Sequence, residues 1–366
     1  MRKLSLADVE DLVTGTTILG VGGGGNPEQG RNSLKEQLDA GKSLILVSLD
    51  ELQPDDLLVS PYFVGSVAQP NNVISKPVIE DAMATALHLL EGKLGKRVAG
   101  TIPAELGGAN TAASLAIAAK LGIPTVDGDL IGRAAPELHQ STVHIFGLPM
   151  IPSAIVSDSG NEIIIEKYAS IDDYEAIARY ASVVSGGHVA VVDTPLSVSQ
   201  AKRCVVRGTI SKSMEIGKAR REAVEEKDFD VVDAISRRLP NCRRIFEGTV
   251  SDYAWKNEKG FLVGDARVRG AGKWEGMELK SWIMNEHIMC WKDGKPIVMP
   301  PDLIMFLEPG TGLGITNDKL AKDANVVVLG ASVDKIWRSP EGLKLFGPRH
   351  FGFDLDYVPF EELSGS

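Results

Sequence analysis

Hydrophobic residues recur at two different spacings along the chain, and the spacing changes near residue 238. Before that point, short apolar runs typical of buried strands alternate with amphipathic stretches of helical period. Strands are expected at 44–49, 56–64, 97–102, 123–126, 163–168 and 188–192. Helices are expected after a capping signal at Ser5 and Asp8, and at 27–40, 77–90, 111–121, 174–183 and 198–206. This alternation predicts a layered sheet covered by helices.

The second part of the chain has closely spaced strand-like runs with glycine turns. Asp293-Gly294 is a strong hairpin signal between two of these runs. Several short strands without helices predict a small β-barrel or sandwich. We therefore expect an α/β domain at 1–238 and a smaller β-rich domain at 239–366. The segment 337–360 is rich in aromatic residues, so we expect the tail to pack back on the first domain.

Composition and charge narrow the class of protein. A length of 366 residues fits two domains, and 43% hydrophobic residues supply ample cores. The net charge of −10 disfavours nucleic acid as a partner. No apolar run approaches the roughly 20 residues that span a bilayer, and no signal peptide is expected. Three scattered cysteines argue against a disulfide framework, so a reducing, bacterial-type cytoplasm is expected. A homo-oligomer is the general expectation for an enzyme of this size.

A run of glycines, Gly22, Gly23, Gly24 and Gly25, separates two predicted helices and is followed by Asn26. Bare backbone there can approach a ligand closely, and the next helix begins where an anion would be favoured. The alternative is a tight turn without a ligand. A dinucleotide site is disfavoured because a helix, not a strand, precedes the run.

A second candidate segment lies between a predicted strand end and a helix start at 103–111. Ligands of open α/β sheets bind outside the carboxyl ends of strands, so Glu105 and Asn110 could face such a crevice. For Asn110, we favour the alternative that it caps the helix.

Two carboxylates, Asp127 and Asp129, follow a predicted buried strand, with Arg133 a turn later. Paired carboxylates at a strand end can hold a divalent metal or act as a general base, and we favour this interpretation. The structural alternative is that Asp127 caps a turn and Asp129 pairs with Arg133. In the same way, His188 and Glu286 are candidate metal ligands from the two sides of a domain cleft.

These segments together resemble one family, that of S-methyl-thiohydantoin desulfurase. The resemblance is carried by the glycine run with Asn26 and Pro27, by 107–111, by 127–137 and by the tail motif 346–352. It covers nearly the whole chain. It implies an N-terminal three-layer α/β domain followed by a β-rich domain.

The resemblance also implies an activity. Family members replace the methylthio group of an S-methyl-thiohydantoin ring by oxygen, and a divalent metal, zinc, is expected to activate the water. On this hypothesis Asp127 and Asp129 hold the metal or take the proton of the water. Glu105, Asn110 and Arg133 orient the ring, while Arg349 closes the site from the tail.

The amides of Gly23, Gly24 and Gly25 suit a developing negative charge. The expected partner is therefore a small ring substrate, with no nucleic acid and no membrane. The alternative is a non-catalytic sensor of small molecules, or an accessory subunit of a hydantoinase-type system, with the same crevice but no metal.

Overall fold

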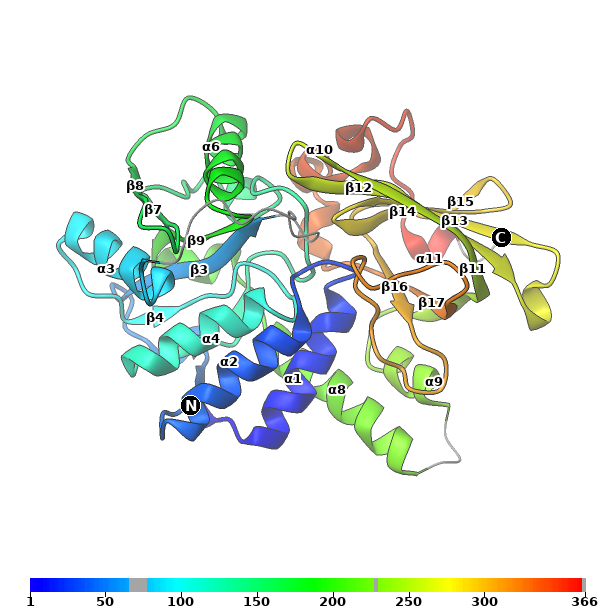
Figure 1. Cartoon of the computed structure of the whole chain (residues 1–366), viewed down its shortest axis with the longest axis horizontal. Coiled ribbons are helices and arrows are strands. Elements are labelled where there is room, and N and C mark those ends of the chain that lie inside the picture. The colour runs from blue at the N-terminus through cyan, green and yellow to red at the C-terminus, as the bar shows by residue number, and fades with distance from the viewer. Residues whose placement is uncertain (66–77, 227–229, 364–366) are drawn as a thin grey trace.

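The computed structural model describes residues 1–65, 78–226 and 230–363, and it has two halves (Figure 1). The first half is built on a mixed sheet of eight strands within the described part of the chain. In spatial order the strands are β1 (Arg2–Lys3), β2 (Ile45–Val47), β5 (Thr125–Val126), β4 (Gly100–Thr101), β3 (Leu57–Gly65), β9 (His188–Ser197), β7 (Ser153–Val156) and β8 (Glu162–Ile165). The strands from β2 to β3 are parallel, and the remaining pairs are antiparallel.

Helices cover the faces of this sheet, and the last of them extend toward the second half of the molecule (Figure 1). They are α1 (Leu6–Leu19), α2 (Pro27–Asp39), α3 (Ala82–Leu94), α4 (Asn110–Leu121), α5 (Thr142–Ile145), α6 (Ile171–Val184), α7 (Val198–Cys204), α8 (Thr209–Glu225) and α9 (Val231–Ser236). The predicted helix at 77–90 begins at Ala82 in the structure, and residue 77 lies outside the described residues. None of the described helices is long and apolar enough to cross a membrane.

Alternating side chains of the central strands explain the three layers. In β3, Leu58 and Tyr62 pack in one core with α6 and α7, whereas Leu57 and Val59 pack in another with α3 and α4. Successive strand residues point to opposite faces, so a strand that is apolar at consecutive positions must be covered on both sides. The three-layer α/β domain that the resemblance implied is therefore confirmed.

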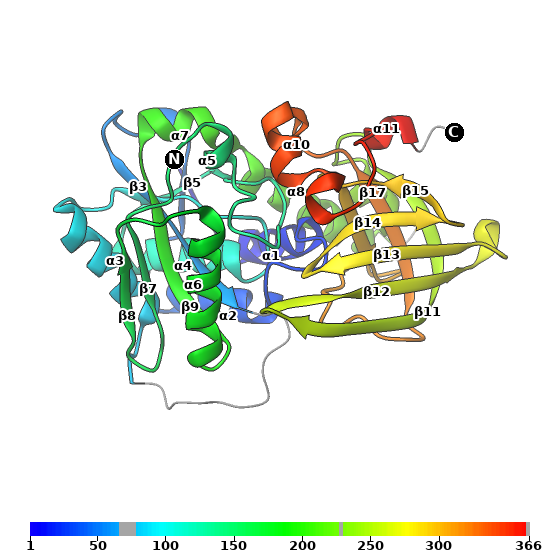
Figure 2. The same cartoon turned by 90° about the horizontal axis from the view of Figure 1, so that it is seen from above.

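The second half is one antiparallel sheet that curves into a half-barrel (Figure 2). Its order is β15 (Lys295–Val298), β14 (Glu286–Lys292), β13 (Glu278–Met284), β12 (Phe261–Gly270), β11 (Arg243–Glu258), β17 (Asn325–Ala331) and β16 (Leu303–Leu307). The hairpin predicted at Asp293-Gly294 joins β14 to β15, and both residues have positive φ. A short two-stranded sheet of β6 (Gly128–Asp129) and β10 (Val206–Arg207) lies outside it.

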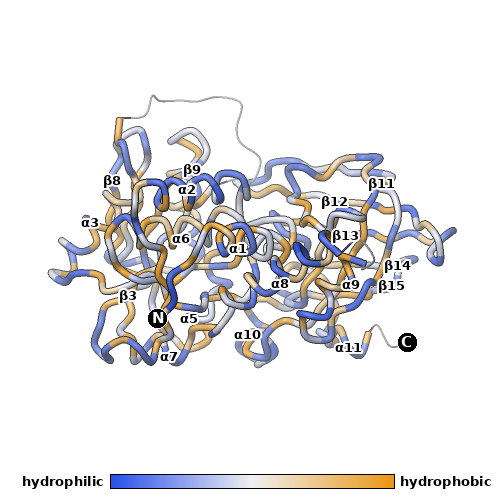
Figure 3. The backbone as a smooth tube through the Cα atoms, turned by 90° about the horizontal axis from the view of Figure 1, so that it is seen from below, coloured by the Kyte–Doolittle hydropathy of each residue, from blue (hydrophilic) through white to orange (hydrophobic). Residues whose placement is uncertain are grey.

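A third hydrophobic core joins the two halves. Val9 of α1 and Ile216 of α8 share this core with Met305 of β16 and Leu329 of β17. The C-terminal segment adds α10 (Pro340–Phe346), η4 (Pro348–Phe351) and α11 (Phe360–Leu363), and α10 lies between the halves in Figure 2. Hydrophobic and hydrophilic stretches alternate within single elements in Figure 3, as expected of elements with one buried face. The junction between the halves is thus a packed region.

Candidate metal centre

Three side chains from distant parts of the chain bring ligand atoms together at this junction. Glu137 and His139 follow β6 on one loop, and His350 comes from η4 in the tail. The two histidine Nε2 atoms are 3.0 Å apart, and the Glu137 Oε2 atom is 2.7 Å from His350 Nε2 and 3.4 Å from His139 Nε2. We call these residues the Glu-His-His triad.

The donor set of the triad fits a divalent transition metal. Imidazole and carboxylate are common zinc ligands, and ligand atoms around a tetrahedral zinc are separated by roughly 3.3 Å when each is about 2.0–2.1 Å from the ion. The three separations in the triad bracket that value. The His139 side chain is 8% exposed, whereas His350 and Glu137 are 22% and 18% exposed. Three protein ligands with partial solvent access are typical of a catalytic rather than a structural zinc site.

Helix α6 holds the loop that carries two triad residues. Arg179 donates through Nη2 to the carbonyl of Pro136 at 2.5 Å, and Glu175 accepts a hydrogen bond from the Leu138 backbone N–H. The two side chains also pair with each other at 2.5 Å. The loop is therefore fixed on both sides of Glu137. Asp172, on the same helix, places a carboxylate oxygen 3.7 Å from Nδ1 of His139.

The tail is anchored on the first half beside the triad. Trp337 donates through Nε1 to the carbonyl of Ile131 at 2.6 Å, and the Arg133 guanidinium lies 5.0 Å from the centre of the Phe346 ring. These contacts bring His350 to Glu137 although 213 residues separate them.

The electrostatics of the triad follow from burial and from mutual contact. Burial acts to raise the pKa of Glu137, but the hydrogen bond with His350 and nearby positive charge outweigh it, and this pKa is lowered. Burial lowers the pKa of His139. An ionised carboxylate and a neutral imidazole are the forms that bind a metal.

The predicted glycine run lies against the C-terminal sheet. A Cβ added to Gly23 would be 1.7 Å from Glu286 Oε1, and the backbone N–H of Gly24 donates to the Glu286 carboxyl group. The backbone of His287 donates to the carbonyl of Val21 at 2.9 Å. The close backbone approach that the glycines permit is therefore made to Glu286, the first residue of β14.

Gly24 and Gly25 meet the segment that carries Glu105. A Cβ on Gly24 would be 2.3 Å from the Gly107 Cα, and one on Gly25 would be 2.6 Å from the Ala109 Cβ. Asn26 caps α2, because its Oδ1 atom accepts from the Glu28 N–H at 2.8 Å. Binding of substrate by Gly23, Gly24, Gly25 and Asn26 stays a prediction.

Glu105 and Asn110 contact each other, but the expected cap at Asn110 is wrong. Ala109 is the N-cap of α4, and Asn110 is its first helical residue. The Asn110 amide instead donates to Glu105 Oε1 at 2.7 Å and accepts from the Phe63 N–H at 3.1 Å. The other oxygen of Glu105 accepts from the Ala135 N–H at 3.1 Å. Glu105 thus ties the strand end to the loop that leads to the triad.

Arg133 is fully buried, and its bonds go to backbone carbonyls. It donates to Ala134, Pro301 and Asp302 at 2.9 Å each, and to His287 at 3.2 Å. It therefore joins the two halves of the molecule. Burial lowers its pKa to about 10, which still leaves it charged at neutral pH. Its predicted role in orienting the ring stays a prediction.

The two aspartates predicted as metal ligands have other partners. Both oxygens of Asp127 accept from Ser211, at 2.9 Å from the backbone N–H and at 2.6 Å from the hydroxyl. Oδ1 of Asp129 accepts from the N–H groups of Ile131 and Gly132 at 2.6 Å each. Burial raises the pKa of Asp129 to about 7. Neither carboxylate belongs to the one group of potential ligands found among the described residues.

The side chains of two other predicted site residues form ion pairs outside the triad. His188 is half exposed and pairs with Asp158 at 3.3 Å. Arg349 is 61% exposed and pairs with Asp354 and Asp356 in the tail, at 2.8 and 3.0 Å. Glu286 is buried, as a candidate site residue should be, but it is not grouped with His188 as a ligand pair.

The triad is the part of the site that sequence reasoning missed. Glu137 and His139 stand two residues apart in a segment already noted for its carboxylates, and His350 lies in the tail motif. No local spacing links the tail to the loop, because the contact depends on how the two halves pack. The signal available in the sequence was that one family motif, 346–352, contains His350 and another, 127–137, contains Glu137.

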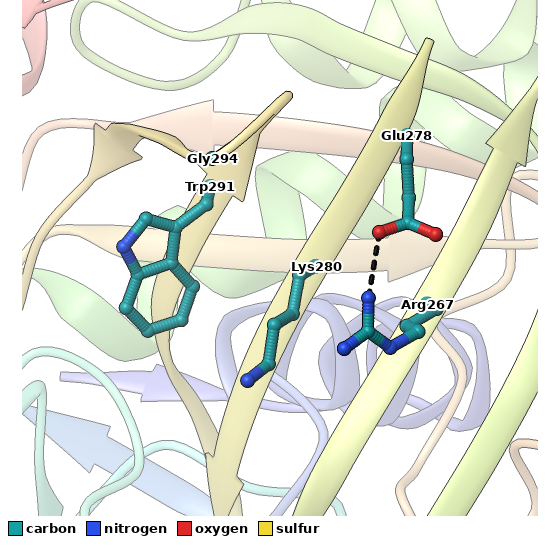
Figure 4. A pocket seen from close by; sticks show the side chains of 5 residues that line it. All are labelled: Arg267, Glu278, Lys280, Trp291 and Gly294. Atoms are coloured by element: carbon teal, nitrogen blue, oxygen red, sulfur yellow. Dashed lines mark hydrogen bonds and ion pairs between the residues drawn. The ribbon is translucent and has the colours of Figure 1, made fainter. Parts of the chain in front are cut away.

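A hollow on the outer face of the C-terminal sheet is separate from this chemistry. It has a volume of about 280 Å³ and is lined by Arg267, Glu278, Lys280, Trp291 and Gly294 (Figure 4). Arg267 and Glu278 satisfy each other at 2.7 Å. It contains no residue of the triad.

The fold and the triad define a two-domain protein, α/β followed by β, with a candidate metal centre between its halves. The chain belongs to the S-Me-THD-like family: the model of the N-terminal domain matches residues 7–167, and that of the C-terminal domain matches residues 169–360. The expected family is therefore confirmed. These family domains meet near residue 168, within the first half, and the boundary expected at residue 238 stays a prediction.

A solved structure shares this fold. A crystal structure of a protein from Chromobacterium violaceum matches with a TM-score of 0.76 and 20% identity, over 98% of this chain and all of that one. At that identity the likeness concerns the fold alone. No curated protein matches the chain in sequence.

Proposed function

We propose that this protein is a metal-dependent hydrolase of a five-membered nitrogen ring, of the S-methyl-thiohydantoin or hydantoin type. The observation that carries the proposal is the Glu-His-His triad, whose three ligand atoms lie within 4.8 Å of one another at the junction of the halves. The family supports a role in thiohydantoin chemistry. The metal ligands we propose are Glu137, His139 and His350, in place of Asp127 and Asp129.

A divalent ion such as zinc, held by the triad, would lower the pKa of a water molecule toward about 7 and so supply a nucleophile at neutral pH. The side chains of the protein would position the metal ligands and the ring. Arg179 and Glu175 fix the loop that carries Glu137 and His139, and such supporting contacts are needed to keep ligand geometry. Glu105 faces the same loop and is the carboxyl group best placed to orient the ring.

The overall reaction is a substitution by water at a ring carbon. The oxygen of water replaces the methylthio group, the carbon–sulfur bond breaks, and the products are a hydantoin and methanethiol. The two hydrogen atoms of water end on the ring nitrogen and on the released sulfur.

The test combines metal content with turnover. Purified protein is incubated with zinc and desalted, its zinc is measured by elemental mass spectrometry, and methanethiol release from an S-methyl-thiohydantoin is followed with a thiol reagent. Glu137→Gln, His139→Ala and His350→Ala are compared with Asp127→Asn and Asp129→Asn. We expect the triad variants to lose both zinc and turnover, and the aspartate variants to keep near-stoichiometric zinc.

Zinc lost only from the aspartate variants would move the metal to the strand end. Wild-type protein that binds no divalent metal and releases no thiol would favour the second candidate, a sensor or accessory subunit. One observation favours that candidate: the triad side chains satisfy one another through hydrogen bonds.

A further inference from the structure

We propose that the Glu286 carboxyl group is the general acid of this reaction and protonates the sulfur atom that leaves the ring. This inference rests on the proposed function and adds to it a catalytic residue outside the triad. On this proposal the C-terminal sheet supplies the group that protonates the leaving sulfur, whereas the triad serves the attacking water.

The first support is the geometry of Glu286. Its side chain is 3% exposed as a residue, and its Oε2 atom has no hydrogen-bond partner among the described residues. The other oxygen lies against Gly23, where only a glycine leaves room for it. Buried polar atoms are almost always satisfied, and an exception in a candidate site indicates a group reserved for a ligand.

The second support is the set of charges around Glu286. From the first half, Glu105, Arg133 and Arg179 face it, and burial together with Glu105 raises its pKa well above the usual carboxyl range. Both arginines give most of their donors to backbone carbonyls, and Arg179 also pairs with Glu175. Neither arginine forms an ion pair with Glu286 in the described structure. Two buried carboxyl groups without such a partner cannot both ionise easily, so burial and their mutual repulsion favour the protonated form of Glu286.

His287, next along the strand, is directed elsewhere. Its ring stacks on Phe306 with centroids 4.0 Å apart, and its Nδ1 atom is 2.9 Å from the Ser281 hydroxyl. Burial lowers the pKa of His287 to about 3, so it adds no positive charge that would ionise Glu286.

The third support is the connection to the triad. Glu105 accepts from the Ala135 N–H, two residues before Glu137, and is itself one of the charges that act on Glu286. Arg133 donates to the carbonyl of His287, beside Glu286. Arg179 holds Pro136, beside Glu137, and also acts on the charge of Glu286. The same residues therefore bond to the segment that leads to the proposed metal loop and lie near enough to act on the charge of the proposed acid.

Every proton in this step is accounted for. Water adds its oxygen to the ring carbon that carries sulfur, and one of its protons ends on the ring nitrogen as the carbon–nitrogen double bond becomes single. The carbon–sulfur bond then breaks, its electron pair stays on sulfur, and the Glu286 proton completes methanethiol. The hydroxyl proton of the added water restores the Glu286 carboxyl as the ring carbonyl forms. No oxidant or reductant is required.

A pair of substrates separates this role from a structural one. An alkanethiolate leaves poorly without a proton, whereas an arylthiolate of low pKa leaves without help. We compare ring substrates with S-methyl and S-(4-nitrophenyl) groups in wild-type protein, Glu286→Gln and the control Glu278→Gln, an exposed glutamate of the same sheet. Zinc content and melting temperature are measured for each protein.

Glu286→Gln should lower kcat for the S-methyl substrate by about 100-fold or more, the usual range for a general acid, and for the aryl substrate by less than about 10-fold. Zinc content should not change, and Glu278→Gln should match wild type. Equal losses on both substrates, or no loss on either, would overturn the assignment. Wild-type protein that is zinc-loaded but inactive on both substrates would instead refute the proposed function, and this inference with it.

A pH profile of the wild-type protein covers the case in which Glu286→Gln does not fold. With the S-methyl substrate, kcat should fall as the pH rises through a group that titrates above the ordinary carboxyl range. With the aryl substrate that descending limb should be absent. Identical profiles for the two substrates would overturn the assignment.

Discussion

At the scale of single residues, position 23 has no room for a side chain larger than that of glycine. Its φ is not in the left-handed region, so the need for glycine comes from the Glu286 carboxylate, 1.7 Å from where a Cβ would stand. We expect Gly23→Ala to lower the free energy of unfolding by about 1–3 kcal/mol, since Glu286 and the loop must move apart. Urea unfolding followed by fluorescence measures this.

Gly92 provides the matched control for that prediction. It lies within α3, has an ordinary φ, and a Cβ there would meet nothing within 4 Å. Gly92→Ala should leave stability unchanged or raise it by up to about 1 kcal/mol, because alanine is the better helix former. If both substitutions change the free energy of unfolding by the same amount, the close approach of Glu286 is not the reason that glycine is needed at position 23.

Single residues also show why the sequence predicted the metal at a different place from the triad. Asp127 and Asp129 have the residue types and spacing of metal ligands, but the same short carboxylates are good acceptors for backbone N–H groups. Asp129 follows this second pattern, with the N–H groups of Ile131 and Gly132 rather than with Arg133. Glu286 was recognisable as a candidate residue from its place on a strand. Its neighbours were not, because they come from the glycine loop and from Glu105.

At the scale of elements, α6 supports the triad through one of its faces. Arg179 is nearly buried between Glu175, the Pro136 carbonyl and the Phe261 ring, whose centre is 3.7 Å from its guanidinium carbon. We expect Arg179→Met to lower zinc affinity by about 10- to 100-fold, since the loop at 136–139 loses its anchor. The free energy of unfolding should fall by about 3–5 kcal/mol, since Glu175 would be left buried without its partner. Competition with a zinc chelator and urea unfolding measure the two effects.

A second substitution distinguishes the two consequences. Replacing Glu175 by leucine in the Arg179→Met background removes the unpaired charge, so stability should partly recover while zinc affinity stays low. Tyr180→Ala is the control, because Tyr180 is 71% exposed on the same helix. Zinc affinity that recovers together with stability would show that α6 acts only on folding.

Elements are also the scale at which the sequence was most informative. The helix after Ser5 was expected from Ser5 and Asp8, and the structure contains that capping box and ends the helix at Leu19. The strands at the centre of the first sheet were expected from their apolar runs. Boundaries were less accurate where a strand is very short, as at Gly100–Thr101, because two paired residues leave almost no periodic pattern.

At the scale of the whole molecule, the triad joins the tail to the first half. Two of its residues precede the C-terminal sheet, and the third, His350, follows the last strand of that sheet in the chain. No periodicity could reveal this, because the pairing depends on Trp337, Phe346 and the packing of α10 at the junction. A metal bound there would close the tail on the body, and metal binding is then linked to the stability of the entire fold.

This linkage makes thermal stability a test of the metal site that does not need a substrate. A metal that binds only the folded state at 100 times its Kd stabilises that state by about 2.7 kcal/mol. For a chain of this size we expect the melting temperature to fall by roughly 5 °C when zinc is removed by a chelator, and to return when zinc is restored. His350→Ala should melt near the temperature of the metal-free wild type and should not respond to zinc. His88→Ala, at a half-exposed position on α3, should respond as wild type does. An equal zinc response in His350→Ala and wild type would place the metal away from the tail, because the ligand that closes the tail would then contribute nothing to its binding.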